Sequence, residues 1–451
     1  MKKFILLSLL ITLSACNTTS QKTEKTEAKS VYKPISDAVL ETATIYEVNI
    51  RQYSNKGTFN AFAKDIPQLK KMGVDILWIM PLYPISVKDR KGGLGSYYAI
   101  QNYTKVNPNF GTLADVKNLV KMAHNNDMYV IFDWVPNHTG RDHVWLKEHP
   151  DFYVRDKKGN PIAPFDWTDV AKLDYSNPAM RKAMIHDMKY WLTTVNIDGF
   201  RCDVAAEVPT DFWEEAVTQL KKVKPIFMLA EAEKADLMHK AFDMQYGWNA
   251  HHIFNQIAQG KTSVKTLDNY MVKVTKDLQP DDITMYFTSN HDENSWNGTV
   301  FERMGDAAET MAALTYALPG MPLIYSGQEY DLKHRLKFFE KDSIPHTKGK
   351  FYSLYTKLNT LKAKNKALNG GKKAGSYTRL KTSNDKTILA FTRSKENDTV
   401  YFLANLSAQK TAFKLDLSGD FKDAISGKEY KLNKDKSLEF TPWEYHFLVN
   451  K

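Results

Sequence analysis

The chain has 451 residues, of which 25% are charged, and its formal net charge is +10 at pH 7. The lysines are scattered without long basic runs, which argues against nucleic-acid binding and favours an ordinary solvated basic surface. The length allows one large domain with a smaller one appended to it. Aromatic residues make up 12% of the chain, enough for a core and for a sugar-binding cleft.

The N-terminal segment predicts an export signal. Two lysines precede an apolar run, residues 4–13, which is too short to cross a bilayer as a helix. The run ends in Leu-Ser-Ala-Cys, which resembles a bacterial lipoprotein processing site. The resemblance implies cleavage before Cys16, a lipid on its sulfur and a lipid-anchored place in the bacterial cell envelope. The alternative is an ordinary secretory signal that contains a cysteine. With Cys16 acylated, Cys202 has no disulfide partner.

The chain from residue 44 alternates between strand-like and helix-like segments, after a signal peptide at 1–15 and a polar tether at 16–35. Helices are predicted at 58–73, near 112–126 and at 178–194. Strands are predicted at 44–52, 75–81, 128–135, 198–205, 226–232, 244–248, 283–290 and 321–329. Eight apolar strands separated by helices predict a closed (β/α)₈ TIM barrel. The alternative is an open doubly wound sheet, and no Gly-rich phosphate-binding motif follows an early strand.

Two segments depart from this alternation. Residues 137–176, after the third strand, carry turn residues and no long helix, and predict a short inserted domain. Residues 370–451 show short alternating strands and turns, which predict a C-terminal antiparallel β-sandwich. The barrel would therefore consist of residues 36–136 and 177–369.

Polar residues collect where the predicted strands end, which is where barrels of this kind place their active sites. They are Tyr98 after strand two, Asp133, Asn137 and His138 at strand three, Arg201 and Asp203 at strand four, Glu231 at strand five, and Asn290, His291 and Asp292 at strand seven. Each alone has an ordinary explanation, such as a helix cap or a satisfied core histidine. Five groups at one end of a barrel indicate an active site instead.

Four segments carry a family resemblance: "DWVPNH", "GFRCDVA", "LAEAE" and "FTSNHDEN". In this order they resemble the four signature regions of the alpha-amylase family of glycoside hydrolases (family 13). The segment "GSYYAIQNYTKVNPNFGTLADVKNLVKMAH" is also similar to that family. The resemblance covers about residues 44–367, and a family-like β-sandwich follows.

The resemblance implies a retaining hydrolase that cleaves α-1,4-glucosidic bonds of starch-like glucans or malto-oligosaccharides by double displacement. An α-glucosidase, a debranching enzyme and a transglycosylase share the same catalytic set and remain alternatives. A non-catalytic carbohydrate-binding lipoprotein is the alternative from another class. Such a protein would be expected to lose one of the three family carboxylates, and all three are present.

The resemblance also implies roles for individual residues. Asp203 would be the nucleophile, Glu231 the acid/base and Asp292 a third carboxylate that holds sugar hydroxyls. Arg201, two residues from Asp203 on one strand face, would keep that carboxylate ionised and oriented. Glu231 would need a less polar setting to stay protonated.

Three further residues would bind the substrate in this interpretation. His138 and His291 would hydrogen-bond the sugar ring, and Tyr98 would stack on its face. Asp133 lies deeper in strand three, and its predicted role is structural.

Calcium is expected to be absent from the place where many family members hold it, and no cofactor is predicted. The resemblance would supply Asn137 and two positions that are Lys172 and Glu207 here. A protonated lysine cannot ligate calcium, which prefers oxygen ligands. The ammonium of Lys172 is expected to replace the ion and to bond Asn137 or Glu207. Alternatively, Lys172 is an ordinary surface residue.

Overall fold

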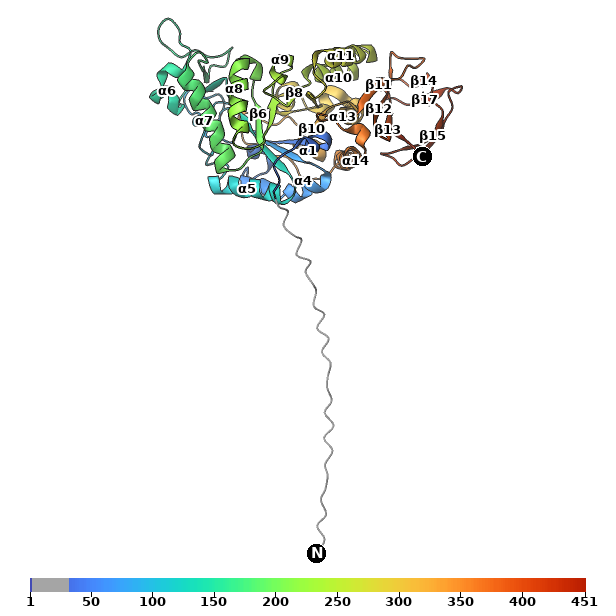
Figure 1. Cartoon of the computed structure of the whole chain (residues 1–451), viewed down its shortest axis with the longest axis horizontal. Coiled ribbons are helices and arrows are strands. Elements are labelled where there is room, and N and C mark those ends of the chain that lie inside the picture. Colours follow the sequence, from blue (N-terminus) through green and yellow to red (C-terminus); the bar gives the residue numbers. More distant parts are fainter. Residues whose placement is uncertain (2–31) are drawn as a thin grey trace.

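A computed structural model describes Met1 and residues 32–451. The predicted signal peptide, the lipidation site at Cys16 and most of the tether lie outside the described residues. Figure 1 shows a central barrel, a small inserted region around α6 on one side, and a C-terminal sheet domain on the other. Within residues 32–451, no helix combines the length and the apolar character that a membrane span needs.

The barrel is closed by eight parallel strands, as the sequence predicts. Their order around the barrel is β1-β10-β9-β8-β7-β6-β3-β2. They are β1 (Ile45–Val48), β2 (Ile76–Ile79), β3 (Tyr129–Trp134), β6 (Gly199–Cys202), β7 (Phe227–Ala230), β8 (Met244–Tyr246), β9 (Ile283–Tyr286) and β10 (Met321–Tyr325). Almost every strand residue is buried, because side chains fill the barrel and helices cover its outside.

The first predicted strand and the first predicted helix are shorter than expected. The strand β1 ends at Val48, and a short helix, α2 (Ile50–Tyr53), follows it. The predicted helix at 58–73 is divided into α3 (Phe59–Ala63) and α4 (Ile66–Met72). Pro67, in the first turn of α4, has no backbone N–H to continue the hydrogen bonds of α3, so the helix restarts there.

Most of the other helices follow barrel strands in sequence, but α1 precedes β1 and α6 lies in the inserted segment. The predicted helix at 178–194 is α7 (Pro178–Thr194), and the one near 112–126 is α5 (Leu113–Asn125), which begins with a capping box of Thr112 and Asp115. The remaining helices are α1 (Asp37–Thr42), α6 (Val144–Glu148), α8 (Thr210–Lys221), α9 (Ala235–Met238), α10 (Trp248–Ala258), α11 (Val264–Asp277), α12 (Val300–Met304), α13 (Ala308–Ala317) and α14 (Lys350–Lys364).

The beginning of the described chain packs against the base of the barrel. The hydroxyl of Tyr32 donates to Asp198 Oδ1 at 2.7 Å, and its ring stacks on His124 with centroids 4.1 Å apart. The ammonium of Lys224 lies 4.8 Å from the centre of the same ring. Asp198 directly precedes β6, so Tyr32 is held at the N-terminal ends of the strands.

The inserted segment lies between β3 and α7. Its strands β4 (His138–Gly140) and β5 (Val170–Lys172) form a two-stranded antiparallel sheet in which His138 pairs with Lys172. Because β4 follows β3 directly, the segment sits at the C-terminal end of the barrel.

The C-terminal domain is antiparallel, as predicted. Six strands form one sheet in the order β11-β12-β13-β18-β15-β16, and β14 pairs with β17. Apolar side chains from both sheets, including Ile388, Leu403, Phe413 and Phe440, form its core. The strands are β11 (Ser376–Arg379), β12 (Ile388–Lys395), β13 (Asp398–Asn405), β14 (Thr411–Phe413), β15 (Gly419–Asp423), β16 (Glu429–Leu432), β17 (Leu438–Phe440) and β18 (Tyr445–Asn450).

A buried arginine connects this domain to the barrel. Arg393, on β12, donates to the carbonyl oxygens of Ala317 at 2.9 Å, Asn369 at 2.6 Å and Gly375 at 3.2 Å. Ala317 is the last residue of α13, so the side chain of Arg393 joins a barrel helix to the C-terminal sheet.

Candidate active site

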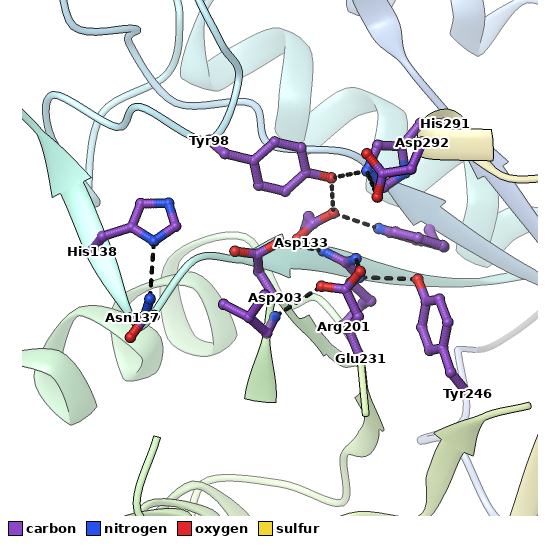
Figure 2. A network of polar contacts seen from close by, with 12 residues as sticks. Tyr98, Asp133, Asn137, His138, Arg201, Asp203, Glu231, Tyr246, His291 and Asp292 are labelled. Atoms are coloured by element: carbon purple, nitrogen blue, oxygen red, sulfur yellow. Dashed lines mark hydrogen bonds and ion pairs between the residues drawn. The ribbon is translucent and has the colours of Figure 1, made fainter. Parts of the chain in front are cut away.

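A cavity of about 540 Å³ opens at the C-terminal ends of the barrel strands. The family resemblance gives seven residues a catalytic or substrate-binding role, and six of them line the cavity: Tyr98, His138, Asp203, Glu231, His291 and Asp292. The seventh, Arg201, lies fully buried beneath them. The structure therefore brings together side chains from five separate segments of the chain (Figure 2).

Arg201 is the centre of the site. Its Nη1 lies 2.9 Å from Asp133 Oδ1 and 3.1 Å from Asp203 Oδ1, and its Nη2 lies 2.9 Å from Glu231 Oε1. Its Nε donates to the hydroxyl oxygen of Tyr246 at 3.1 Å. One guanidinium thus holds three carboxyl groups from three adjacent strands, which offsets the desolvation of a buried cation.

This sharing affects the electrostatics of Asp203. Burial raises the pKa of Asp203 well above its usual value, the neighbouring Glu231 raises it further, and Arg201 opposes the rise. Burial likewise raises the pKa of Asp133 to about 6. Arg201 therefore acts in the direction expected from the sequence and opposes the effect of burial on Asp203, whose role as an ionised nucleophile stays a prediction. Asp133 and Asp203 thus share one guanidinium, while burial favours the protonated forms of both.

The setting of Glu231 differs from the expectation. A less polar environment was predicted, but the carboxyl accepts the backbone N–H of Val204 at 2.8 Å and forms the ion pair with Arg201. The reason is the strand order, because β7 lies directly beside β6. A residue just beyond β7 reaches the arginine of its neighbour.

A chain of hydrogen bonds extends from this cluster to the first strand. The hydroxyl of Tyr98 donates to Asp133 Oδ2 at 3.1 Å and lies 2.8 Å from His291 Nε2. The other ring nitrogen of His291, Nδ1, lies 2.6 Å from Glu47 Oε1. Although burial opposes the charge, Asp292 and Glu47 raise the pKa of His291 to about 9. His291 is therefore a cation at neutral pH and donates from both nitrogens.

Sequence reasoning missed Glu47 as a member of this site. It is fully buried in β1, at the end of the hydrogen-bond chain. A glutamate inside the apolar segment "TIYEVN" was the available signal, because a buried acid in a strand needs a partner. Asp133, for which a structural role was predicted, also accepts the indole N–H of Trp78 at 3.0 Å and lies at the centre of the network.

His138 approaches the cavity from the inserted segment. Burial lowers the pKa of His138 to about 3, so its ring is neutral. The amide Nδ2 of Asn137 donates to its Nδ1 at 3.4 Å, and Trp167 lies 5.4 Å from it, centroid to centroid.

Comparison with known families agrees with this geometry. The profile described as "Alpha amylase, catalytic domain" matches residues 26–171 and 164–401. The chain belongs to the alpha-amylase family. A second profile, "Maltogenic Amylase, C-terminal domain", matches residues 377–449 and so covers the antiparallel sheet domain. The family resemblance carried by the four sequence segments is thereby confirmed.

Individual relatives span most of the chain. The alpha-amylase MalA of Haloarcula japonica is 25% identical over 87% of this chain, which covers 59% of that protein. A maltogenic alpha-amylase, AmyB, from Thermotoga neapolitana has a crystal structure that is 30% identical, with a TM-score of 0.84 over 91% of this chain and 99% of that chain. An alpha-amylase from Lactobacillus plantarum is also 30% identical, with a TM-score of 0.81 over 91% of this chain and 99% of its own.

The contacts of Lys172, at the place where many family members were expected to hold calcium, differ from the prediction. Within residues 32–451, the ammonium of Lys172 makes no hydrogen bond or ion pair with Asn137 or Glu207, so that part of the hypothesis is wrong. Lys172 is half-buried at the end of the short strand β5, and Glu207 is exposed. Solvent is therefore available to both charges without a direct contact. In the same described part of the chain, no three or more His, Cys, Asp or Glu side chains are grouped to hold a metal ion.

Proposed function

We propose that this chain is a retaining α-glycoside hydrolase that cleaves α-1,4-glucosidic bonds of starch-like glucans or malto-oligosaccharides. The observation that supports this most is the pair Asp203 and Glu231. Their carboxyl groups come from adjacent strands, face one cavity and are held by the same arginine. Double displacement needs two such carboxyl groups on either side of the scissile bond.

In this mechanism Asp203 is the nucleophile. Its Oδ1 is held by Arg201, which leaves the other oxygen for attack on the anomeric carbon. The attack forms a glycosyl ester on Asp203 and breaks the bond to the leaving oxygen, which takes a proton from Glu231. Glu231 then removes a proton from water, which hydrolyses the ester. Two inversions return the original anomeric configuration.

A proton on Glu231 provides the acid in this mechanism. Glu231 and Asp203 lie on the same guanidinium, and Glu231 is one of the groups that raise the pKa of Asp203. We assign that proton to Glu231 when a sugar lies between the two groups, because Arg201 then stabilises the negative charge of Asp203.

Asp292, Tyr98 and the two histidines bind the sugar in this proposal. Asp292 lies 3.4 Å from the cationic ring of His291, so its carboxylate is fixed at the edge of the cavity where it can accept sugar hydroxyls. His138 is neutral and adds a hydrogen-bonding edge from the inserted segment.

The names of the relatives support the substrate class. The two solved structures with 30% identity are called alpha-amylases, one of them maltogenic. An α-glucosidase from Apis mellifera is 24% identical over 71% of this chain, so the same-family alternatives remain compatible with the site.

The stereochemistry of the first-formed product tests this function. Proton NMR during hydrolysis of maltotetraose should show the α-anomer first, followed by slow mutarotation. A first-formed β-anomer would refute the nucleophile role of Asp203. Starch, maltotriose, pullulan, isomaltose and sucrose, each with resolved products, would distinguish the alternatives within the family.

We further propose that the mature protein is anchored to a membrane of the bacterial cell envelope through an acylated Cys16. The support is the processing motif in the sequence, and two or three acyl chains on one residue give stable anchoring. The wild-type protein should fractionate with membranes. A Cys16→Ala protein found equally in the membrane fraction would contradict this proposal.

A further inference from the structure

Two loops meet along one side of the active-site cavity. One loop, residues 88–96, follows β2, and the other, residues 337–342, follows β10. The carboxylate of Glu340 accepts the backbone N–H of Gly93 at 2.7 Å, and the N–H of Leu94 donates to the carbonyl oxygen of Phe339 at 2.9 Å. These bonds join the loops backbone to backbone and backbone to side chain. We call the pair of loops the wall.

The two loops of the wall pack closely against each other. Gly92 has a φ of +66°, and a Cβ there would overlap the Cβ of Phe339. A Cβ on Gly93 would lie 2.7 Å from a carboxylate oxygen of Glu340. The first loop can therefore approach the second only because these positions are glycines.

A buried arginine fastens both loops from below. Arg51, on α2, is 5% exposed. It donates to the carbonyl oxygens of Leu94 at 3.3 Å, Gly95 at 3.2 Å and Phe338 at 3.4 Å. Among the described residues no carboxylate forms an ion pair with it, so its donors serve the two loop backbones. Arg51 is thus a positioning residue for the wall.

The wall also reaches the inserted segment above the cavity. The ammonium of Lys91 lies 3.5 Å from Asp169 Oδ1, and Asp169 is nearly buried. Both residues line the cavity. This ion pair continues the wall from the barrel loops to the segment that carries His138.

The position of the wall relative to the catalytic groups decides its effect. Phe338 lies nearly parallel to Tyr98, with centroids 6.4 Å apart, and Trp296, four residues after Asp292, lies 5.1 Å from Phe338. The wall therefore stands on the side of Tyr98 and Asp292. In Figure 2 these two residues lie above Asp133, and Glu231 lies below it.

We propose that the wall closes the glycone end of the pocket, so that the enzyme acts from non-reducing chain ends and releases short products of uniform length. This inference rests on the proposed function. Glu231 protonates the leaving oxygen, so the leaving part of the substrate departs on the Glu231 side. The part transferred to Asp203 lies on the opposite side, against the wall, which limits how many sugar units fit there.

A substrate blocked at its non-reducing end tests the proposal. The wild-type enzyme should hydrolyse an aryl maltoheptaoside at least 100-fold faster than the same compound with a 4,6-O-acetal on its non-reducing glucose. From amylose it should release one short oligosaccharide while iodine staining falls slowly. Equal rates on both maltoheptaosides would overturn the proposal that the wall closes the glycone end of the pocket. Failure to cleave any α-glucan would contradict the proposed function instead.

Variants locate the effect in the wall. In a Lys91→Ala/Glu340→Ala protein, the ratio of blocked to unblocked rates should rise at least tenfold. The matched control is Lys337→Ala, an exposed side chain of the same loop that does not line the cavity, and its ratio should stay unchanged. If the double variant does not fold, Phe339→Ala replaces it in the test, because it keeps the backbone hydrogen bonds of both loops. Its ratio of blocked to unblocked rates should also rise. An unchanged ratio in every folded wall variant would overturn the proposal.

Discussion

At the scale of single residues, the site depends on one guanidinium shared among three carboxyl groups. Arg201 contacts Asp133, Asp203 and Glu231 at 2.9–3.1 Å, and no side-chain atom of it is exposed. Glu231 and Asp133 both raise the pKa of Asp203. A change to either of them therefore alters the proton affinity of Asp203 as well as its own chemistry.

Substitution of the two proposed catalytic carboxyls should separate their roles. Asp203→Asn should keep the fold, checked by circular dichroism, and lose nearly all turnover on every substrate, because no glycosyl ester can form. Glu231→Gln should slow maltotriose hydrolysis by about 10²–10⁴-fold, the usual range for a lost general acid. An activated aryl glycoside needs little protonation and should be largely spared in its first step. Equal losses on both substrates would argue against Glu231 as the acid.

Glu47 is predicted to set the basic limit of activity through His291. Its carboxylate helps to raise the pKa of His291 to about 9, which keeps the ring charged between pH 6.5 and 9. In Glu47→Gln this attraction is lost, the pKa of His291 falls, and the basic limb of kcat/KM should move down by about 1–3 pH units. The measurement is the pH profile of kcat/KM on maltotriose.

The matched control is Glu41→Gln, the same change at a buried glutamate of α1 at the other end of the barrel. Its basic limb should coincide with that of the wild type. A basic limb that stays in place in Glu47→Gln would show that the charge of His291 does not depend on Glu47.

At the scale of helices and strands, sequence patterns predict the elements whose position depends only on which residues are buried. Eight apolar runs give eight barrel strands because a parallel strand is covered on both faces. The pattern at 58–73 did not show the break before α4, since apolar spacing continues across Pro67. Contacts made in three dimensions were also missed: Glu47 meets His291 from 244 residues away, and the wall joins segments that are equally remote.

The prediction on metal dependence concerns the paired strands β4 and β5, because Lys172 is the last residue of β5. EDTA should neither lower activity nor shift the melting temperature, because calcium needs 6–8 oxygen ligands and Lys172 stands at an expected ligand position. Lys172→Ala should change stability by no more than about 0.5 kcal/mol, as its ammonium has neither predicted partner. Differential scanning calorimetry with EDTA and with added calcium measures both. A large fall in the melting temperature on chelation, reversed by added calcium, would overturn this prediction.

At the scale of the whole molecule, the barrel and the C-terminal sheet domain share a buried connection. Arg393 of β12 donates to carbonyl oxygens of Ala317 and Asn369. Replacing it with methionine leaves those acceptors without donors in a place that water does not reach. Arg393→Met should therefore lower the free energy of unfolding by about 3 kcal/mol, as hydrogen bonds from a charged group are worth about 1.5–3 kcal/mol.

Urea denaturation followed by tryptophan fluorescence measures this loss. Lys410→Met provides the comparison, since Lys410 is an exposed residue of the same domain whose ion pair with Glu439 is worth at most about 1 kcal/mol. If both variants lose the same small amount, Arg393 does not join the domains.

The contact of Tyr32 with Asp198 has a consequence for orientation. It fixes the beginning of the folded chain at the N-terminal ends of the strands, while the cavity opens at their C-terminal ends. A protein acylated at Cys16 would then be tethered to the bilayer from the base of its barrel, the end opposite the mouth of the pocket. Attachment at that end leaves the mouth of the pocket open to polysaccharide in the surrounding solution.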